Sequence, residues 1–474
     1  MSEAGLRFPT ESTTSTARDV LADALRKADP VGARAVEHET NWRRHYLTHY
    51  VRAVEAGVGD AAAARRIAHD GIRSAQDQML FGDVPLGQAI DSAPLAQMLK
   101  THTVTGNAEA ETELSVPYRG ERLRGEALDV QLVDWRDRGI VTSSFVEAIR
   151  TVMAHPEWLR LEGDTVLVLG AGAEMGPLRA LQHWGAETVA IDLPRTDLQD
   201  RLVEQAGEGA GRTHLPARIV TKASADTGAD LLVDLPAIAE WLDHLPGRLV
   251  LGNYCYADGA KHVLVSMAAD ALAAHLLKER PDTGLSFLAT PTDVYVVDGE
   301  DIASAEAKYR RRSFTSAART PLRVVSGGRL LQRQYPPGAE LGTCDALVPQ
   351  QGPNYALAKR LQRWRATDAI ASGARDSLNV APATRTRSVV KNKALAAAYA
   401  GAHRFGVEVF DPATSNVLMA ALLVHDLRAG QAPSDEPWQD EHRGAAHGGL
   451  WTAAYHPRSA LGLAAVIGIG ALRN

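Results

Sequence analysis

The sequence predicts an α/β protein in which a doubly wound parallel sheet follows an α-helical N-terminal domain. From residue 164 onward, short apolar runs alternate with helix-like segments, which is the pattern of repeated β–α–β units. Between residues 17 and 106, apolar residues instead recur at steps of three and four, as on one face of a helix. We therefore expect a flexible tail over 1–16, a helical domain over 17–115, a connector over 116–160 and the α/β domain over 161–474.

Composition and charge narrow the class of protein. Of 474 residues, 45% are hydrophobic, and the formal net charge of −6 gives no basic excess for binding nucleic acids or anionic membranes. Two cysteines, Cys255 and Cys344, cannot build a disulfide framework, which favours a reducing compartment. The N-terminus shows no apolar signal core, and no run reaches the about 20 apolar residues of a membrane span. We expect a soluble, cytoplasmic protein whose partner is a small molecule.

Local signals predict the individual elements. Asp60 is the expected N-cap of the helix AAAARRIAHDGIRSAQDQML, and the connector is expected to hold one helix, Ser143 to His155. Two strands are expected at TVLVLG and ETVAID. Further strands are expected at 217–222, 248–254, 284–290 and 322–327, and helices at 234–244, 260–279, 353–373 and 413–428. Residues 291–350 are too long for one connection and are expected to form an insertion that covers the site.

A glycine-rich turn follows the first strand of the α/β domain. Gly170, Gly172 and Gly176 precede a helical segment, where glycine permits a tight turn and lets a pyrophosphate approach the backbone and the helix N-terminus. The second strand ends in Asp192, where an acid would hold the ribose hydroxyl of NAD and repel the 2′-phosphate of NADP. These features predict a Rossmann-type dinucleotide site for NAD, with NADP as the alternative because Arg195 lies nearby.

Glu174 lies inside this turn, where its charge opposes a pyrophosphate. S-adenosylmethionine has no phosphate and would tolerate that charge. However, the methyl-donor version of the turn usually has an acid two residues before the first glycine, where this chain has Val168. Dinucleotide binding is therefore favoured over methyl-donor binding.

A tyrosine and a lysine, Tyr355 and Lys359, stand four residues apart in a helical segment and so share one face. A phenol with a pKa near 10 is a poor acid or base at neutral pH, and an adjacent ammonium lowers that pKa. Such a pair can move a proton at an alcohol or carbonyl oxygen while a nicotinamide moves the hydride. Two such residues on a helix are more often an ordinary surface pair, so the hypothesis depends on the motifs around them.

Taken together, the motifs resemble the short-chain dehydrogenase/reductase superfamily. LGAGAEMG is close to the glycine turn of its extended branch, and LVLGNY stands where that family has its N-N-A-G strand. GARDSLNVAPATRTRS follows the Tyr-x-x-x-Lys helix and is similar to the family's G-I-R-V-N-x-V-x-P-G segment. FDPATSNVLMAALLVHDL then resembles the family's penultimate helix, so the order of the motifs matches over roughly residues 164–455.

The resemblance implies a role for each matching residue. Tyr355 would be the catalytic acid/base, and Lys359 would lower its pKa and hold the nicotinamide ribose. Pro382 would meet the carboxamide, Thr386 or Ser388 would lie near the phosphates, and Asn253 would be the structural asparagine after the fourth strand.

One departure concerns the family's catalytic serine, which usually lies about a dozen residues before the tyrosine. Here that distance falls on the loop-like Gly342–Cys344 stretch. The hydroxyls at expected strand ends are Thr290 and Ser326, both far upstream of Tyr355. Thr290 is preferred as the assisting hydroxyl, because its strand directly follows the 260–279 helix.

No metal site is predicted. His45 and His49 lie four apart on an expected helix, but no third ligand is evident, so a solvent-facing pair is favoured. Asp440, His442 and His447 lie in or beside a polar loop expected at 429–447, where a metal has no further support in the sequence.

The favoured function is an NAD(P)-dependent oxidoreductase that transfers a hydride at a carbonyl or alcohol, with Tyr355 moving the proton. A lyase, epimerase or dehydratase on the same scaffold is the alternative, as is a non-catalytic dinucleotide-binding protein. The family often dimerises through its Tyr-Lys helix, so a homodimer is also an expectation.

Overall fold

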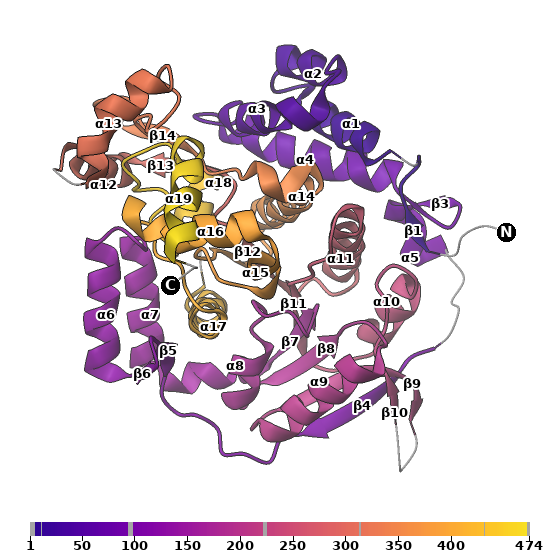
Figure 1. Cartoon of the computed structure of the whole chain (residues 1–474). Helices are drawn as coiled ribbons and strands as arrows, with labels where there is room; N and C mark the ends of the chain where they lie inside the picture. The colour runs from indigo at the N-terminus through magenta and orange to yellow at the C-terminus, as the bar shows by residue number, and fades with distance from the viewer. Residues whose placement is uncertain are drawn as a thin grey trace.

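The computed structural model describes residues 5–10, 12–92, 98–220, 225–311, 314–430 and 432–471, so that residues 1–4 and 11 of the expected tail lie outside it. Its centre is a mostly parallel eight-stranded sheet in the order β10-β9-β8-β7-β11-β12-β15, with β4 paired to β9 (Figure 1). The parallel strands are β7 (Asp164–Leu169), β8 (Glu187–Ile191), β9 (Arg212–Val220), β11 (Arg248–Asn253), β12 (Gly284–Ala289) and β15 (Arg375–Val380). The edge strands β4 (Lys100–Thr105) and β10 (Ala225–Thr227) both pair antiparallel with β9.

Helices cover both faces of this sheet. Successive side chains on its strands point to opposite faces, and they belong alternately to two buried clusters. Leu167 and Leu169 of β7 belong to the first cluster, and Val166 and Val168 belong to the second. The first cluster includes α10 (Leu235–Asp243), α11 (Ala260–Glu279) and α14 (Gly352–Ala371). The second includes α6 (Gly125–Asp137), α7 (Ser143–Ala154), α8 (Leu178–His183), α9 (Thr196–Glu208) and α17 (Pro412–Ala429).

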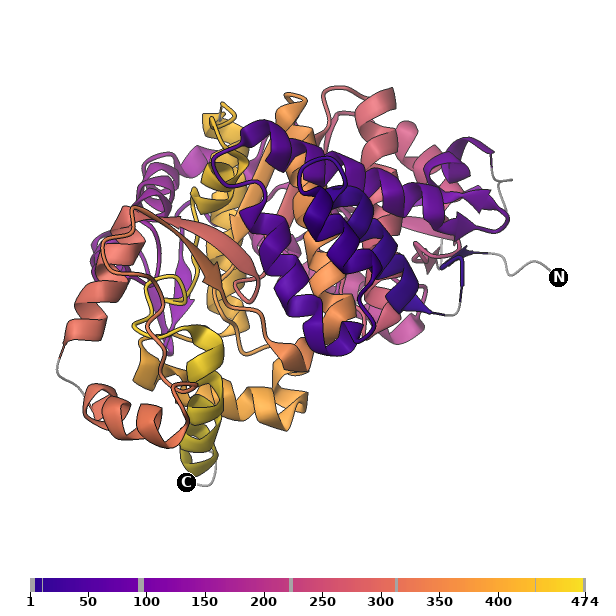
Figure 2. The same ribbon diagram turned by 90° about the horizontal axis from the view of Figure 1, so that it is seen from above.

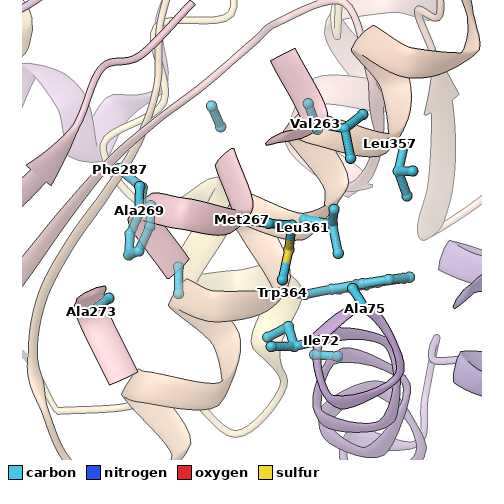
Figure 3. Close-up of a cluster of buried hydrophobic side chains, with 14 of the residues drawn as sticks. Ile72, Ala75, Val263, Met267, Ala269, Ala273, Phe287, Leu357, Leu361 and Trp364 are labelled. Atoms are coloured by element: carbon cyan, nitrogen blue, oxygen red, sulfur yellow. The ribbon is translucent and has the colours of Figure 1, made fainter. Parts of the chain in front are cut away.

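The N-terminal helices share the first cluster. These helices are α1 (Thr13–Leu25), α2 (Pro30–Glu37), α3 (Trp42–Glu55) and α4 (Ala61–Gln78). Asp60 caps α4 as expected, since its carboxylate accepts the Ala63 N–H at 2.9 Å. Ile72 and Ala75 of α4 lie beside Trp364 of α14 (Figure 3), and the view from above shows α4 running along α14 (Figure 2). The helices therefore pack on the α/β part through a common core.

The segment that precedes β7 also contains strands. β1 (Leu6–Arg7), β2 (Leu80–Phe81) and β3 (Val84–Pro85) form a small sheet, and 3₁₀ turn η1 (Leu86–Gln88) and α5 (Ala89–Ser92) follow. β4 lies within 17–115 yet extends the central sheet, and α1 begins within the expected tail, at Thr13. β5 (Val116–Tyr118), β6 (Glu121–Leu123), α6 and η2 (Pro156–Arg160) join α7 in the connector, where only α7 was expected.

The insertion contains a two-stranded antiparallel sheet, β13 (Val294–Asp298) and β14 (Leu341–Asp345), together with α12 (Gly299–Arg310) and α13 (Phe314–Val325). Two predictions were wrong here. Residues 322–327 are not a strand but lie in α13 and the turn after it, because only Leu322 packs on a buried cluster while Val324 and Val325 are exposed. The stretch expected to be a loop, Gly342–Cys344, lies in β14.

The rest of the chain runs close to the site. After β15 come α15 (Arg387–Lys391), α16 (Lys393–Gly401) and η4 (Ala402–Phe405), and η3 (Pro349–Gln351) precedes α14. The expected polar loop 429–447 contains α18 (Pro437–His442), and α19 (Pro457–Ala471) ends the described chain. By length and composition α11 is the one described helix apolar enough to cross a membrane, but 61% of its apolar window is buried inside the molecule.

Candidate active site at the carboxyl ends of the parallel strands

Most of the predicted site residues follow the carboxyl ends of parallel strands. The glycine turn follows β7, Asp192 follows β8, Asn253 ends β11, Thr290 follows β12, and Pro382 and Thr386 follow β15. Because carboxyl ends of parallel strands meet at one edge of a sheet, these residues are brought to the same edge from five different strands.

Close packing explains the first two glycines of the turn. Gly170 has φ +75°, and a Cβ there would lie 3.0 Å from the backbone of Cys255, just beyond β11. The N–H of Gly172 donates to the Asp192 carboxylate at 2.8 Å, and a Cβ on Gly172 would lie 2.7 Å from Leu198. Asp192 therefore holds the turn in shape in addition to any contact with a ligand.

The helix after the glycine turn, whose N-terminus was expected to bind phosphates, is short. α8 has six residues and begins after Pro177, so its N-terminus offers only a small dipole to a phosphate. Glu174 instead forms an ion pair with the Arg387 guanidinium at 3.0 Å and accepts the Arg387 N–H at 2.7 Å. This contact brings the glycine turn against the Thr386–Ser388 segment at the start of α15.

Tyr355 lies in the first turn of α14 against the end of β12. Burial raises the pKa of its phenol to about 12, and the nearby hydroxyls of Thr290 and Thr292 oppose this rise. The two threonine hydroxyls are 2.9 Å apart. The structure therefore brings Thr290 to Tyr355 across the insertion, whereas Ser326 lies at the end of α13 with its hydroxyl bonded to Arg323 O and Leu330 N.

Lys359 lies one turn further along α14. Its ammonium donates to Leu288 O at 3.4 Å and to Gln362 Oε1 at 3.0 Å. Burial lowers the pKa of Lys359 to about 8. Burial, the threonine hydroxyls and two other groups have the largest effects on the pKa of Tyr355, so the expected lowering of the phenol pKa by the Lys359 ammonium is not among its main causes.

The sequence reasoning missed His262, which lies in the first turn of α11. Its ring meets the Tyr355 ring edge-on, with the centroids 5.4 Å apart, and it is 1% exposed. Both ring nitrogens are buried with no hydrogen-bond partner. Burial, with a smaller effect of the Lys359 charge, lowers the pKa of His262 to about 3, so the ring is neutral at physiological pH.

Cys255 links the glycine turn to the Tyr355 group. Its backbone packs on Gly170, and its thiol is close enough to interact electrostatically with both Asp192 and Lys359. Burial raises the pKa of this thiol, so it stays protonated and inert. Asn253 supports the same turn by accepting the Cys255 N–H at 3.3 Å.

An apolar cavity opens beside the threonines. Thr292 and Tyr399 lie in its wall, and the insertion contributes Leu347 and Val348. Other side chains of the wall come from η4 and the residues after it, from the segment between α18 and α19, and from α19. They include Phe405, Val407, Leu450, Tyr455 and Leu461. Thr292, whose hydroxyl is bonded to that of Thr290, thus lies in the wall of a cavity that accepts an apolar group.

The β15 segment lies partly apart from this chemistry. Pro382 is buried, and its carbonyl accepts the Thr384 hydroxyl at 2.9 Å, so its visible contacts are within its own turn. Thr386 is the N-cap residue of α15, and its hydroxyl lies 2.9 Å from the Ser388 hydroxyl.

Comparisons with protein-family models, curated proteins and solved structures found no match for this chain.

Proposed function

We propose that the protein is an NAD-dependent oxidoreductase, with NADP as the alternative cofactor, that transfers a hydride at a carbonyl or alcohol carbon. The observation that carries the proposal is the position of Tyr355: its phenol lies near the hydroxyls of Thr290 and Thr292, one helical turn from Lys359. A tyrosine, a hydroxyl and a lysine are thereby gathered next to the glycine turn through Cys255.

The sheet order supports a Rossmann-type fold. Numbered along the chain, the six parallel strands lie in the order 3-2-1-4-5-6, which is the order of doubly wound dinucleotide-binding sheets. Ligands of such sheets bind where the strand order reverses, here between β7 and β11. Gly170 and Cys255 follow these two strands, so the glycine turn stands at the reversal.

The residues at this edge fit a dinucleotide with one rearrangement. The glycine turn would lie along the pyrophosphate, and Asp192 would accept the ribose hydroxyl, which favours NAD over NADP. Glu174 accepts the Arg387 N–H, and this donor would be available to a bound pyrophosphate once the carboxylate moves aside. The orphaned nitrogens of His262 are consistent with a bound molecule near Tyr355.

The proton of the reaction would be donated by a side chain of this protein. When bound, the nicotinamide exchanges the hydride with the substrate carbon. Tyr355 is neutral at physiological pH, since its pKa is raised to about 12, and is suited to donate its proton to a carbonyl oxygen. Thr290 and Thr292 orient that phenol, and Lys359 lies close enough to the site to bind the cofactor ribose. The adjacent apolar cavity points to a carbonyl or alcohol that carries an aliphatic or aromatic group.

The test measures cofactor binding and turnover separately. NADH and NADPH are titrated calorimetrically, and apolar ketones, aldehydes and alcohols are then screened by nicotinamide absorbance. In Tyr355→Phe we expect turnover to fall at least 100-fold with cofactor affinity unchanged, because the proton donor is lost. Tyr254→Phe is the matched control: it removes another buried phenol, which bonds to Ser286.

Three results would contradict the proposal: no binding of either cofactor, unchanged turnover in Tyr355→Phe, or equal loss in the Tyr254→Phe control. Substrate conversion without net change in nicotinamide absorbance would identify the protein instead as a lyase, epimerase or dehydratase on the same scaffold. Cofactor binding with no dependence of function on Lys359 would indicate a non-catalytic binding protein.

A further inference from the structure

A second cluster of polar side chains lies away from Tyr355, where the insertion meets α18. Asp298 ends β13 and caps α12, Asp301 lies in the first turn of α12, and His442 ends α18. One ligand atom from each of the three residues lies within 4.8 Å of the others. His442 Nε2 is 2.9 Å from Asp301 Oδ2 and 3.8 Å from Asp298 Oδ2.

A buried histidine points at the same cluster. His447 is fully buried, and its Nε2 has no hydrogen-bond partner although it lies 4.0 Å from Asp301 Oδ1. The Gly449 N–H donates to His447 Nδ1 at 3.1 Å, so the proton of this neutral ring is on Nε2. His447 is therefore an N–H donor aimed at Asp301, which is the arrangement in which outer residues orient a metal-binding carboxylate.

We propose that Asp298, Asp301 and His442 bind a divalent cation of the zinc class. Two carboxylate oxygens and one imidazole nitrogen are ligands that zinc accepts, with a water in the fourth position. Asp298 leaves an entry path, because its side chain is 39% exposed, whereas that of Asp301 is 9% exposed.

Charge around the cluster favours a cation. Asp298 is the N-cap residue of α12, and Glu300 and Asp301 lie in its first turn. Lys308 is the opposing cation that interacts with Asp301, and burial lowers its pKa to about 8. Three carboxylates and one ammonium leave a net negative charge, which a divalent cation balances once His442 binds it as a neutral ring.

The bound ion would fasten the insertion to the C-terminal part of the chain. Glu441, beside His442, holds Arg363 of α14 at 2.7 Å, and α14 carries Tyr355 and Lys359. The ion is thus placed to fix α18, the insertion and α14 relative to one another. This inference does not depend on the proposed redox function, since it concerns different residues and a different ligand.

Calorimetric titration of the chelator-treated full-length protein with Zn²⁺ tests the site. We expect one Zn²⁺ per chain and an increase in the unfolding temperature on binding. Co²⁺ offers a local reading, because Trp438 and Trp451 lie 6.2 and 5.2 Å from the His442 ring and their fluorescence should be quenched.

Variants separate this site from adventitious binding. Asp298→Asn keeps an oxygen to cap α12 but removes the ligand oxygen, and His442→Gln removes the nitrogen; we expect each to lower Zn²⁺ affinity at least tenfold. His69→Gln is the control, since His69 also pairs with a single carboxylate, Asp368, at 3.0 Å. No stoichiometric binding, or equal affinity in wild type and Asp298→Asn, would overturn the proposal.

Discussion

At the scale of the single residue, Lys359 gives the sharpest pH dependence. Its pKa in the folded protein is about 8, below the 10.4 or so of an unfolded lysine, so the unfolded chain binds more protons between these values. The free energy of unfolding should therefore rise with pH in this window. Relative to Lys359→Met, we expect wild type to gain about 2 kcal/mol between pH 7.5 and 9.5.

Urea unfolding at the two pH values measures this gain, and Lys391→Met, at an exposed position, is the control. A wild-type gain no larger than that of Lys359→Met would mean that water reaches the ammonium. The same desolvation is the cost of burying a cation one helical turn from Tyr355.

Which residues gather at the site was partly predictable from the sequence. The tyrosine and lysine motif predicted Tyr355 and Lys359 as site residues, and the order of the strands predicted Thr290. Cys255 and His262 carried no motif. Cys255 is brought near Lys359 by its position after β11, and His262 meets Tyr355 because α11 packs on α14. A lone histidine in an apolar helix gives no sign that both of its nitrogens will lack partners.

At the scale of the element, α14 is fixed by buried ion pairs. Arg360 and Arg363 each donate to Asp293 at 2.6 Å, and all three side chains are at most 4% exposed. Removing one partner of a buried pair leaves an uncompensated charge, so Asp293→Asn should lower the free energy of unfolding by about 3–5 kcal/mol. Urea unfolding measures the loss.

The exposed pair Arg73–Asp77 supplies the comparison, because Asp77→Asn should cost less than about 1 kcal/mol. Equal losses in the two variants would show that the Asp293 pair is no more than a surface contact. Asp293 follows Thr292 directly, so the ion pairs also fix the turn that bears the site hydroxyls against Tyr355.

Elements were predictable where the local pattern and the tertiary structure agree. The buried strands β7, β8, β11 and β12 are short apolar runs, and their predictions are confirmed. α6 was missed although Leu128, Leu132 and Trp135 are spaced as on one helical face. β4, KTHTVT, has a largely polar sequence and becomes a strand only by pairing with β9, which no local signal records.

At the scale of the whole molecule, the N-terminal helices and the sheet share one buried cluster. The helical periodicity of the N-terminal part suggested a domain boundary near residue 115, but periodicity describes single elements and does not say which of them share a core. Whether the N-terminal helices and the sheet fold as one unit can be tested at the contact of Gly71 in α4 with Trp364 in α14. A Cβ on Gly71 would lie 2.3 Å from the indole ring.

Gly71→Ala should therefore destabilise the protein by about 1–3 kcal/mol, although alanine is the better helix former by about 1 kcal/mol. Gly207→Ala in α9 is the matched control, since its Cβ meets nothing within 4 Å and should stabilise the protein by up to about 1 kcal/mol. If the helices and the sheet form one cooperative unit, Gly71→Ala shifts a single urea transition, seen alike by tryptophan fluorescence and far-ultraviolet circular dichroism. Two separate transitions, with only one displaced by the substitution, would instead mean that the helices fold as a domain of their own against a preformed sheet.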